Sequence, residues 1–339
     1  MRTPSTTLFM HFLLAAIVLP ILPALSRDYH LTGGFIVLLE SAFPLGAVLG
    51  YTVFGRVVET RGVNIIVRMS WVSQTLAMLA LLLGLGGGFF LSRFFGGFAT
   101  GILPALISTT RGSFETRGSL PRVSTLIAAV TAGSALGPLL VPFLVPNIHL
   151  VALIGVGVCI AGYAASPRVN APPVALPAHT LRKTRWVPLL CVVGIMGGLG
   201  IIYQTSRLVL PFYDQSYLAL GPRGVALALA LLSWGAWGTQ RLLAKFSTNI
   251  PPHTSYLGAA ALILTAVAVM FSGHTFFLFL GVLAMAVGIG LADPLGSLLC
   301  LRYTKEGASG RTIGTVFTFL AGAKMIAPLL AAWLVRPMG

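Results

Sequence analysis

Long apolar runs separated by short polar segments dominate the chain, and eleven of them are about as long as a bilayer is thick. Roughly 20 consecutive apolar residues cross the hydrocarbon core when they are wound as a helix. A helix satisfies its own backbone hydrogen bonds in lipid, so a helix is the expected form of each run. The pattern therefore predicts an all-α integral membrane protein with about eleven transmembrane helices. The runs cover residues 7–25, 33–55, 64–84, 88–109, 123–145, 149–166, 187–212, 222–243, 255–272, 275–300 and 312–335, with 207–223 the least clear stretch.

Composition and charge support the same class. The 339 residues are 56% hydrophobic and only 9% charged, whereas soluble domains carry about 25% charged residues. The net charge of +15 would suit a nucleic-acid partner, but its distribution argues against one. With the N-terminus inside, sixteen of the 22 Lys and Arg residues fall on the cytoplasmic side, and this bias sets orientation. We expect a multi-pass protein of the plasma membrane, most simply a bacterial inner membrane, with a cytoplasmic N-terminus. The residues placed on the outer side are Arg27, Arg207, Arg223 and Arg336.

Three segments recur about 190 residues later in similar form. The pairs are FLSRFFGGFATGILP (90–104) with FLGVLAMAVGIGLADP (279–294), GPLLVPFL (137–144) with APLLAAWL (327–334), and ILPALSRDY (21–29) with VLPFYDQSY (209–217). The offset indicates a six-helix unit repeated in one orientation, as in parallel-repeat transporters. We predict a six-helix bundle over 1–166, a cytoplasmic linker over 167–186 and a five-helix bundle over 187–339. A twelfth helix, matching 149–166, is expected and is missing.

The segment GRVVETRGVN (55–64) resembles the signature that the major facilitator superfamily carries between its helices 2 and 3. Gly55, Glu59 and Gly62 stand at matching positions, and Arg61 is displaced by one residue. In that family the loop latches the two halves, which implies that Glu59 and Arg61 form ion pairs that break when the protein changes state. Ordinary basic-inside loop chemistry is the alternative.

Two further segments resemble signatures of the same superfamily. RFFGGFATG (93–101) is similar to the helix-4 signature. Gly133, Gly137 and Pro138 resemble the helix-5 signature of the drug/proton antiporter branch, although Val141 and Pro142 follow where that branch often has paired glycines. The resemblance implies two pseudo-symmetric helical bundles around a central cavity. It also implies a transporter rather than an enzyme. Because Pro138 lacks an N–H, we expect a kink in this span.

Two acids and two bases are predicted to lie within spans: Glu40, Asp293, Arg93 and Lys324. A charge at the bilayer centre costs about 2.5–3.5 kcal/mol on insertion scales. A carboxyl group that is neutral when buried and ionised when wetted suits proton coupling, so Glu40 is the expected main proton site, with Asp293 and Arg93 as further coupling residues. Each residue has a structural alternative. Glu40 could simply bond to a neighbour, Asp293 could cap a helix broken at Pro294, and Arg93 could be neutralised by the second span. Lys324 could pair with Asp293 or hold an anionic substrate.

Aromatic residues in the expected cavity helices suit a hydrophobic substrate. The candidates for the cavity wall, together with Lys324, are Phe43, Tyr203, Trp234, Trp237 and Phe319. Core packing or lipid contact is the alternative for each ring.

The predicted activity is proton-coupled efflux of a small, partly hydrophobic drug or metabolite by alternating access. We expect a monomer whose partners are its substrate, protons and the bilayer, with no nucleic acid. The sequence contains no GxxxxGK[ST] phosphate-binding motif and no metal-ligand spacing, so no cofactor or metal is expected. Two alternatives stay open. One is proton-coupled uptake of a small, possibly anionic metabolite, and the other is a non-transporting scaffold or receptor derived from a transporter.

Overall fold

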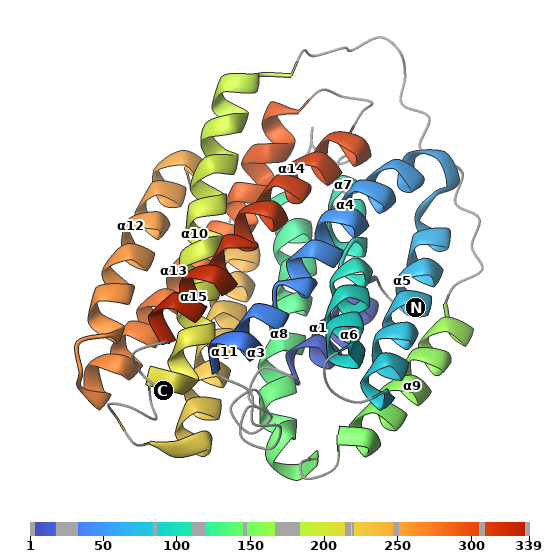
Figure 1. The fold of residues 1–339 in the computed structure, drawn as a ribbon. Coiled ribbons are helices and arrows are strands. Elements are labelled where there is room, and N and C mark those ends of the chain that lie inside the picture. The colour runs from blue at the N-terminus through green and yellow to red at the C-terminus, as the bar shows by residue number, and fades with distance from the viewer. Residues whose placement is uncertain are drawn as a thin grey trace.

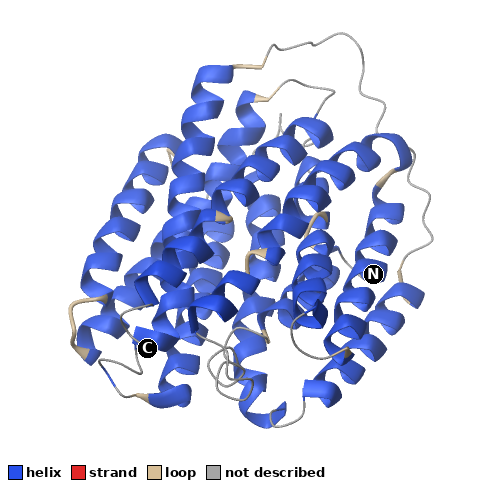
Figure 2. Ribbon diagram, in the orientation of Figure 1, coloured by secondary structure: helices blue, strands red, loops and turns tan. Residues whose placement is uncertain are grey.

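A computed structural model describes residues 4–17, 33–83, 87–109, 119–144, 148–166, 184–213, 218, 220–246, 251–304 and 309–335. Within these ranges the regular elements are helices, and no strand occurs (Figure 2). The helices are α1 (Pro4–Ala16), α3 (Gly33–Leu39), α4 (Ala42–Arg61), α5 (Val63–Leu82), α6 (Gly87–Ala99), α7 (Ile102–Thr109), α8 (Ser119–Leu144), α9 (Ile148–Ala164), α10 (Trp186–Tyr213), α11 (Gly221–Phe246), α12 (Pro252–Met270), α13 (Thr275–Tyr303), α14 (Ser309–Lys324) and α15 (Ile326–Val335).

The helices match the apolar runs of the sequence. In the described ranges, eight helical stretches are long and apolar enough to cross a membrane, and α1 and α9 contribute two shorter apolar helices. The remaining run corresponds to α11, whose 26 residues include Arg223, Arg241 and Lys245 and are therefore more polar. The predicted all-α membrane fold is confirmed.

Three of the spans are helix pairs with a break in the middle: α3–α4, α6–α7 and α14–α15. Each break lies three or four residues before a proline, because a proline has no N–H to donate to the carbonyl group four residues back. At the first break the N–H of Phe43 donates to the carbonyl of Glu40 instead (3.1 Å). The residues four positions before these prolines are Glu40 for Pro44 and Thr100 for Pro104, which lie at the breaks, and Lys324 for Pro328, which is the last residue of α14 before the break at Met325.

The helices of the first half, α1 to α9, lie beside those of the second half, α10 to α15 (Figure 1). Contacts between the halves run mainly through α4 with α14, α8 with α11, and α3 with α15, and Figure 1 shows α4 running beside α14. Within the first half, α4 and α6 approach very closely at glycines. A Cβ atom on Gly97 would collide with the carbonyl of Phe43, and one on Gly46 would collide with that of Phe94.

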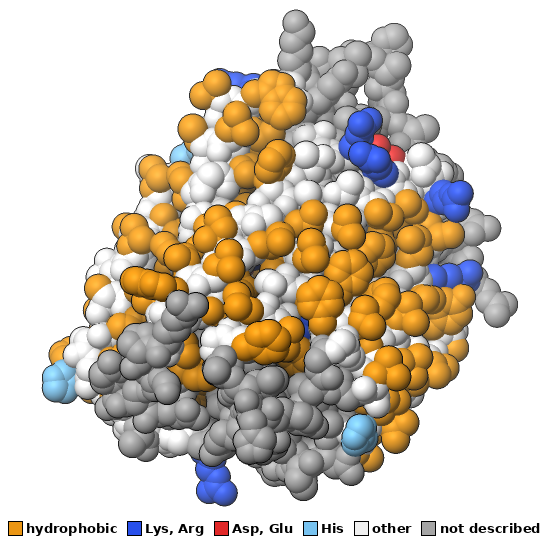
Figure 3. All heavy atoms as spheres, viewed as in Figure 1, with side chains coloured by type: hydrophobic (Ala, Val, Ile, Leu, Met, Phe, Trp, Pro, Cys, Tyr) orange, Lys and Arg blue, Asp and Glu red, His pale blue; other side chains and the backbone are white. Residues whose placement is uncertain are grey.

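The molecular surface fits a membrane environment. On the face drawn in Figure 3, hydrophobic side chains cover the middle of the molecule, and Lys and Arg side chains gather mostly near one end. Large apolar side chains such as Leu153, Leu190 and Trp333 are more than half exposed. Lipid tails would cover such side chains, which agrees with a multi-pass membrane protein.

Candidate functional site

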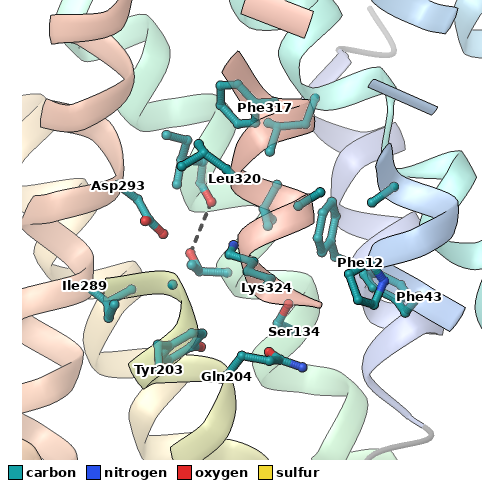
Figure 4. Close-up of a pocket in the computed structure, with 18 of the residues that line it drawn as sticks. Phe12, Phe43, Ser134, Tyr203, Gln204, Ile289, Asp293, Phe317, Leu320 and Lys324 are labelled. Atoms are coloured by element: carbon teal, nitrogen blue, oxygen red, sulfur yellow. Dashed lines mark hydrogen bonds between the residues drawn. The ribbon is translucent and has the colours of Figure 1, made fainter. Parts of the chain in front are cut away.

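A cavity of about 220 Å³ lies between the two halves. Its wall combines residues of α1, α4, α6, α7 and α8 with residues of α10, α11, α13, α14 and α15. Figure 4 shows side chains from both halves pointing into this space. Since neither half encloses the cavity alone, a change in how the halves meet would change access to it.

A buried ion pair lies beside the cavity, and its Arg93 is one of the lining residues. Arg93 on α6 donates from Nε (3.0 Å) and Nη2 (2.8 Å) to Oε2 of Glu40 at the α3–α4 break. Its third contact runs from Nη1 to the carbonyl of Ala15 on α1 (3.0 Å), and its Cζ lies 4.6 Å from the ring centre of Phe43. Glu40 is 1% exposed and Arg93 is 5% exposed. The pair thus ties three helices together beside the cavity, and it brings three predicted site residues, Glu40, Arg93 and Phe43, into contact.

One oxygen of this pair is left over. The Oε1 atom of Glu40 is buried and has no hydrogen-bond partner among the residues described. An unsatisfied buried polar atom is costly, so the pair leaves one carboxylate oxygen without the hydrogen bond that its burial calls for.

Asp293 and Lys324 face the same cavity from the second half (Figure 4). No ion pair within 4.0 Å joins them; in the described ranges the pair of Glu40 and Arg93 alone meets that limit. The pairing expected from the sequence is therefore not formed in this structure. Asp293 also lies inside the continuous helix α13, beside Pro294, rather than at the cap of a broken helix.

Arg207 lines the cavity, and the sequence reasoning missed it. The charge count assigned it to the outer side of the membrane, near the end of the predicted run 187–212, and it was not named as a cavity residue; it lies within α10. Its Cζ lies 5.3 Å from the ring centre of Tyr203. Its Nε is buried without a partner in the part of the chain that the structure describes. The sequence did contain a feature that could have identified Arg207 as a cavity residue. It stands four residues before Pro211, as Glu40 and Lys324 stand four residues before their prolines.

The predicted aromatic wall is only partly present. Phe43 and Tyr203 line the cavity, as does Lys324. Trp234 and Trp237 on α11 do not line it, and they stack edge to face on each other with ring centres 5.2 Å apart. Phe319 is 65% exposed and does not line it either. The two tryptophans and Phe319 are therefore not retained as cavity residues.

The missed aromatic residues of the wall are Phe12, Tyr51 and Phe317. On α14 the spacing of residues along the helix indicates which side chains face the cavity. Phe317, Leu320 and Lys324 recur at three- and four-residue intervals and share a face, whereas Phe319 falls outside this series.

Comparison with known proteins decides the family. The family model of the Major Facilitator Superfamily matches residues 5–328. This chain belongs to the major facilitator superfamily. Its fold also resembles the crystal structure of the human organic anion transporter MFSD10 (TETRAN), with a TM-score of 0.74, 16% identity, and coverage of 99% of this chain and 93% of that chain. The comparison with curated protein sequences finds no match.

The major facilitator loop signature lies where α4 meets α14. Gly62 has φ 77°, a conformation that favours glycine, and it closes α4 by donating from its N–H to Val58 (3.2 Å). Glu59 accepts a hydrogen bond from the backbone N–H of Arg311 in the first turn of α14 (2.8 Å). In the described ranges neither Glu59 nor Arg61 forms an ion pair within 4.0 Å. The contact between halves at Glu59 is therefore with a helix N-terminus instead of a basic side chain.

The same crossing is packed on glycine. A Cβ atom on Gly55 would lie 2.7 Å from the carbonyl oxygen of Gly310 and 3.0 Å from Cα of Gly314. A hydrogen bond between the hydroxyl groups of Thr52 and Thr318 (2.9 Å) also joins α4 to α14. These short contacts hold the two halves of this major facilitator protein together beside the cavity.

The helix-5 signature packs inside the first half. A Cβ atom on Gly137 would lie 2.8 Å from the carbonyl oxygen of Leu13, and one on Gly133 would collide with the carbonyl of Phe9. Both glycines therefore admit α1 close to α8. Pro138 lies within α8, but its side chain is outside the described part of the structure.

Proposed function

We propose that this major facilitator protein is a proton-coupled secondary transporter that exports a small, partly hydrophobic compound. The observation that carries the proposal is the buried pair of Glu40 and Arg93 in the wall of a cavity that both halves build. Burying two charges is costly unless they hold each other. A residue pair of this kind is therefore well suited to respond to a proton.

The contacts of Arg93 suggest how a proton would act on the cavity. Protonation of Glu40 removes the negative charge that Arg93 binds, while its bond to the Ala15 carbonyl and its contact with Phe43 need no carboxylate. The contact between α4 and α6 at the cavity wall then weakens, while the contact of α6 with α1 remains. The free energy to drive transport comes from the proton gradient, of which voltage supplies about 2.3 kcal/mol per charge per 100 mV.

Alternating access would occur as one half rocks against the other around the cavity. We propose that the crossing of α4 and α14 is the latch of this motion, with Gly55, Glu59 and Gly62 at its centre. The moving units would be residues 1–166 and 187–339, joined by the linker 167–186. The basic-inside bias supports a cytoplasmic N-terminus in a bacterial inner membrane, and we expect a monomer of the drug/proton antiporter branch.

A substrate screen in an efflux-deficient bacterial host tests this function. Cells that express the wild-type protein should tolerate at least one toxic compound better than cells that express Glu40→Gln, because the variant cannot release a proton at that site. Phe319→Ala, at the exposed surface of α14, serves as the control and should behave like wild type.

Two results would redirect the proposal. Counterflow in oriented vesicles that shows accumulation toward the cytoplasmic side would establish uptake in place of export. If no compound is moved and single-cysteine probes on the cavity wall show equal access from each side in all conditions, the protein is a scaffold or receptor instead of a transporter.

A further inference from the structure

We propose that the substrate carries an anionic group and that Arg207 and Lys324 of the second half bind it. The inference rests on the proposed transport function and names its substrate class, an amphipathic organic anion such as an aromatic carboxylate. The reasoning starts from the charges that line the cavity.

Four charged side chains belong to the described cavity wall: Arg93, Arg207, Asp293 and Lys324. Arg93 already holds Glu40, so that pair contributes no net charge. The remaining wall contains two cations and one acid. An uncompensated charge in a largely apolar cavity is unfavourable. An anionic ligand would neutralise the excess positive charge.

The two cations flank one face of α10. Gly200, Tyr203 and Arg207 all line the cavity, and their spacing places them on the same side of the helix. A Cβ atom on Gly200 would lie 2.7 Å from Cε of Lys324, so the lysine chain from α14 lies across this glycine. Seven residues of helix rise separate Gly200 from Arg207, about 10 Å along the axis. Along α10, Tyr203 lies between these two positions.

The guanidinium group of Arg207 is prepared for a carboxylate. Its planar array of N–H donors matches the two oxygens of a carboxylate group. The ring of Tyr203, 5.3 Å from Cζ, helps to fix the orientation of that plane. Its Nε has no partner among the residues described and is buried, so one donor awaits an acceptor.

The rest of the cavity suits an apolar body. Phe12 and Phe43 face the second half from α1 and α4, and Phe317 closes the space from α14 (Figure 4). An anionic head at α10 and an aromatic body against these rings would fill both parts of the site. A cationic substrate would instead place its charge at Asp293, and the experiment includes that case.

Binding to the purified protein in detergent tests the inference. The probes are aromatic carboxylates of one to three rings, each with the carboxamide and the primary amine of the same skeleton, and the readouts are the shift in Tm and the Kd. The best carboxylate should bind at least about tenfold more tightly than its amide and its amine, because losing one charged partner typically costs that much. Arg207→Gln and Lys324→Gln should each remove most of this preference. Arg241→Gln is the matched control, because Arg241 also lies over an aromatic ring, Trp237 (5.9 Å), but does not line the cavity.

The possible outcomes separate the substrate class from the transport function. If amides or amines bind as tightly as the carboxylates, the anion site is wrong, and transport of those compounds on a pH gradient would still support the proposed function. If a carboxylate binds through Arg207 but a pH gradient never moves it, the anion site stands and the transport proposal fails. If a variant does not fold, the anion site is tested by comparing the Kd of each carboxylate with the Kd of its own amide on the wild-type protein.

Discussion

The pair of Glu40 and Arg93 should behave as one energetic unit, and a double-mutant cycle measures this directly. Glu40→Gln leaves the Arg93 charge buried without a counter-charge, with neutral partners such as the Ala15 carbonyl and the Phe43 ring. Arg93→Gln leaves the Glu40 carboxylate buried without a cation. Breaking one side of a buried pair costs about 3–5 kcal/mol, whereas replacing both sides by neutral groups is far less harmful.

The structure allows these numbers to be refined. Glutamine at position 40 keeps an acceptor for Nε or Nη2 of Arg93, so we expect the lower end, about 3 kcal/mol, for each single variant. The double variant Glu40→Gln/Arg93→Gln removes both charges and restores a neutral hydrogen bond. It should be no less stable than either single variant, which gives a coupling free energy of at least about 3 kcal/mol.

Equilibrium unfolding with a denaturing detergent, followed by tryptophan fluorescence, supplies the four free energies. Phe319→Ala is the control for surface substitutions and should change the unfolding free energy by less than about 0.5 kcal/mol. The reasoning is refuted if the single variants unfold like wild type, or if the effects of the two substitutions simply add.

Three further variants test other parts of the structure. Gly97→Ala forces a Cβ atom onto the carbonyl of Phe43 and should destabilise the fold by about 1–3 kcal/mol, whereas Gly194→Ala, which meets no atom within 4 Å, should be neutral in the same unfolding assay. Glu59→Gln weakens the hydrogen bond to the first turn of α14, by about 1 kcal/mol for a solvent-exposed bond. Distances measured by electron paramagnetic resonance between spin labels on the ends of α4 and α14 should become longer. An unchanged distance distribution would show that Glu59 is not part of the latch. Tyr203→Ala should weaken ligand binding about tenfold, whereas Phe319→Ala should leave the Kd unchanged; equal effects would contradict the assigned cavity wall.

The presence and the order of the helices could be predicted from the sequence, because each span needs a long apolar run. In lipid the backbone must satisfy its own hydrogen bonds, and a helix does so. The two charged residues of the first-half pair could also be picked out, since Glu40 and Arg93 interrupt otherwise apolar sequence. Their contact was one of two interpretations that the sequence left open, because it depends on the close approach of α4 and α6 at Gly46 and Gly97. These two glycines are not distinguishable in advance from the many glycines of these spans.

The direction of side chains was harder to predict. A transmembrane helix is apolar on all sides, so its sequence gives little sign of which face meets the cavity. Trp234 and Phe319 were chosen as aromatic residues near the expected cavity, and both point elsewhere. Polar residues four positions before a proline were the better guide, since Glu40, Arg207 and Lys324 all line or border the cavity. Arg207 was missed because its charge suggested a loop.

A proton measurement tests the central claim most directly. Proteoliposomes loaded with a pH-sensitive dye report internal pH when the compound that performs best in the screen is added outside, at zero initial pH difference. We expect a proton flux that requires the compound, appears with wild type and Phe319→Ala, and is lost with Glu40→Gln. A compound that crosses the membrane through the wild-type protein without moving protons, or an equal proton flux with Glu40→Gln, would contradict it.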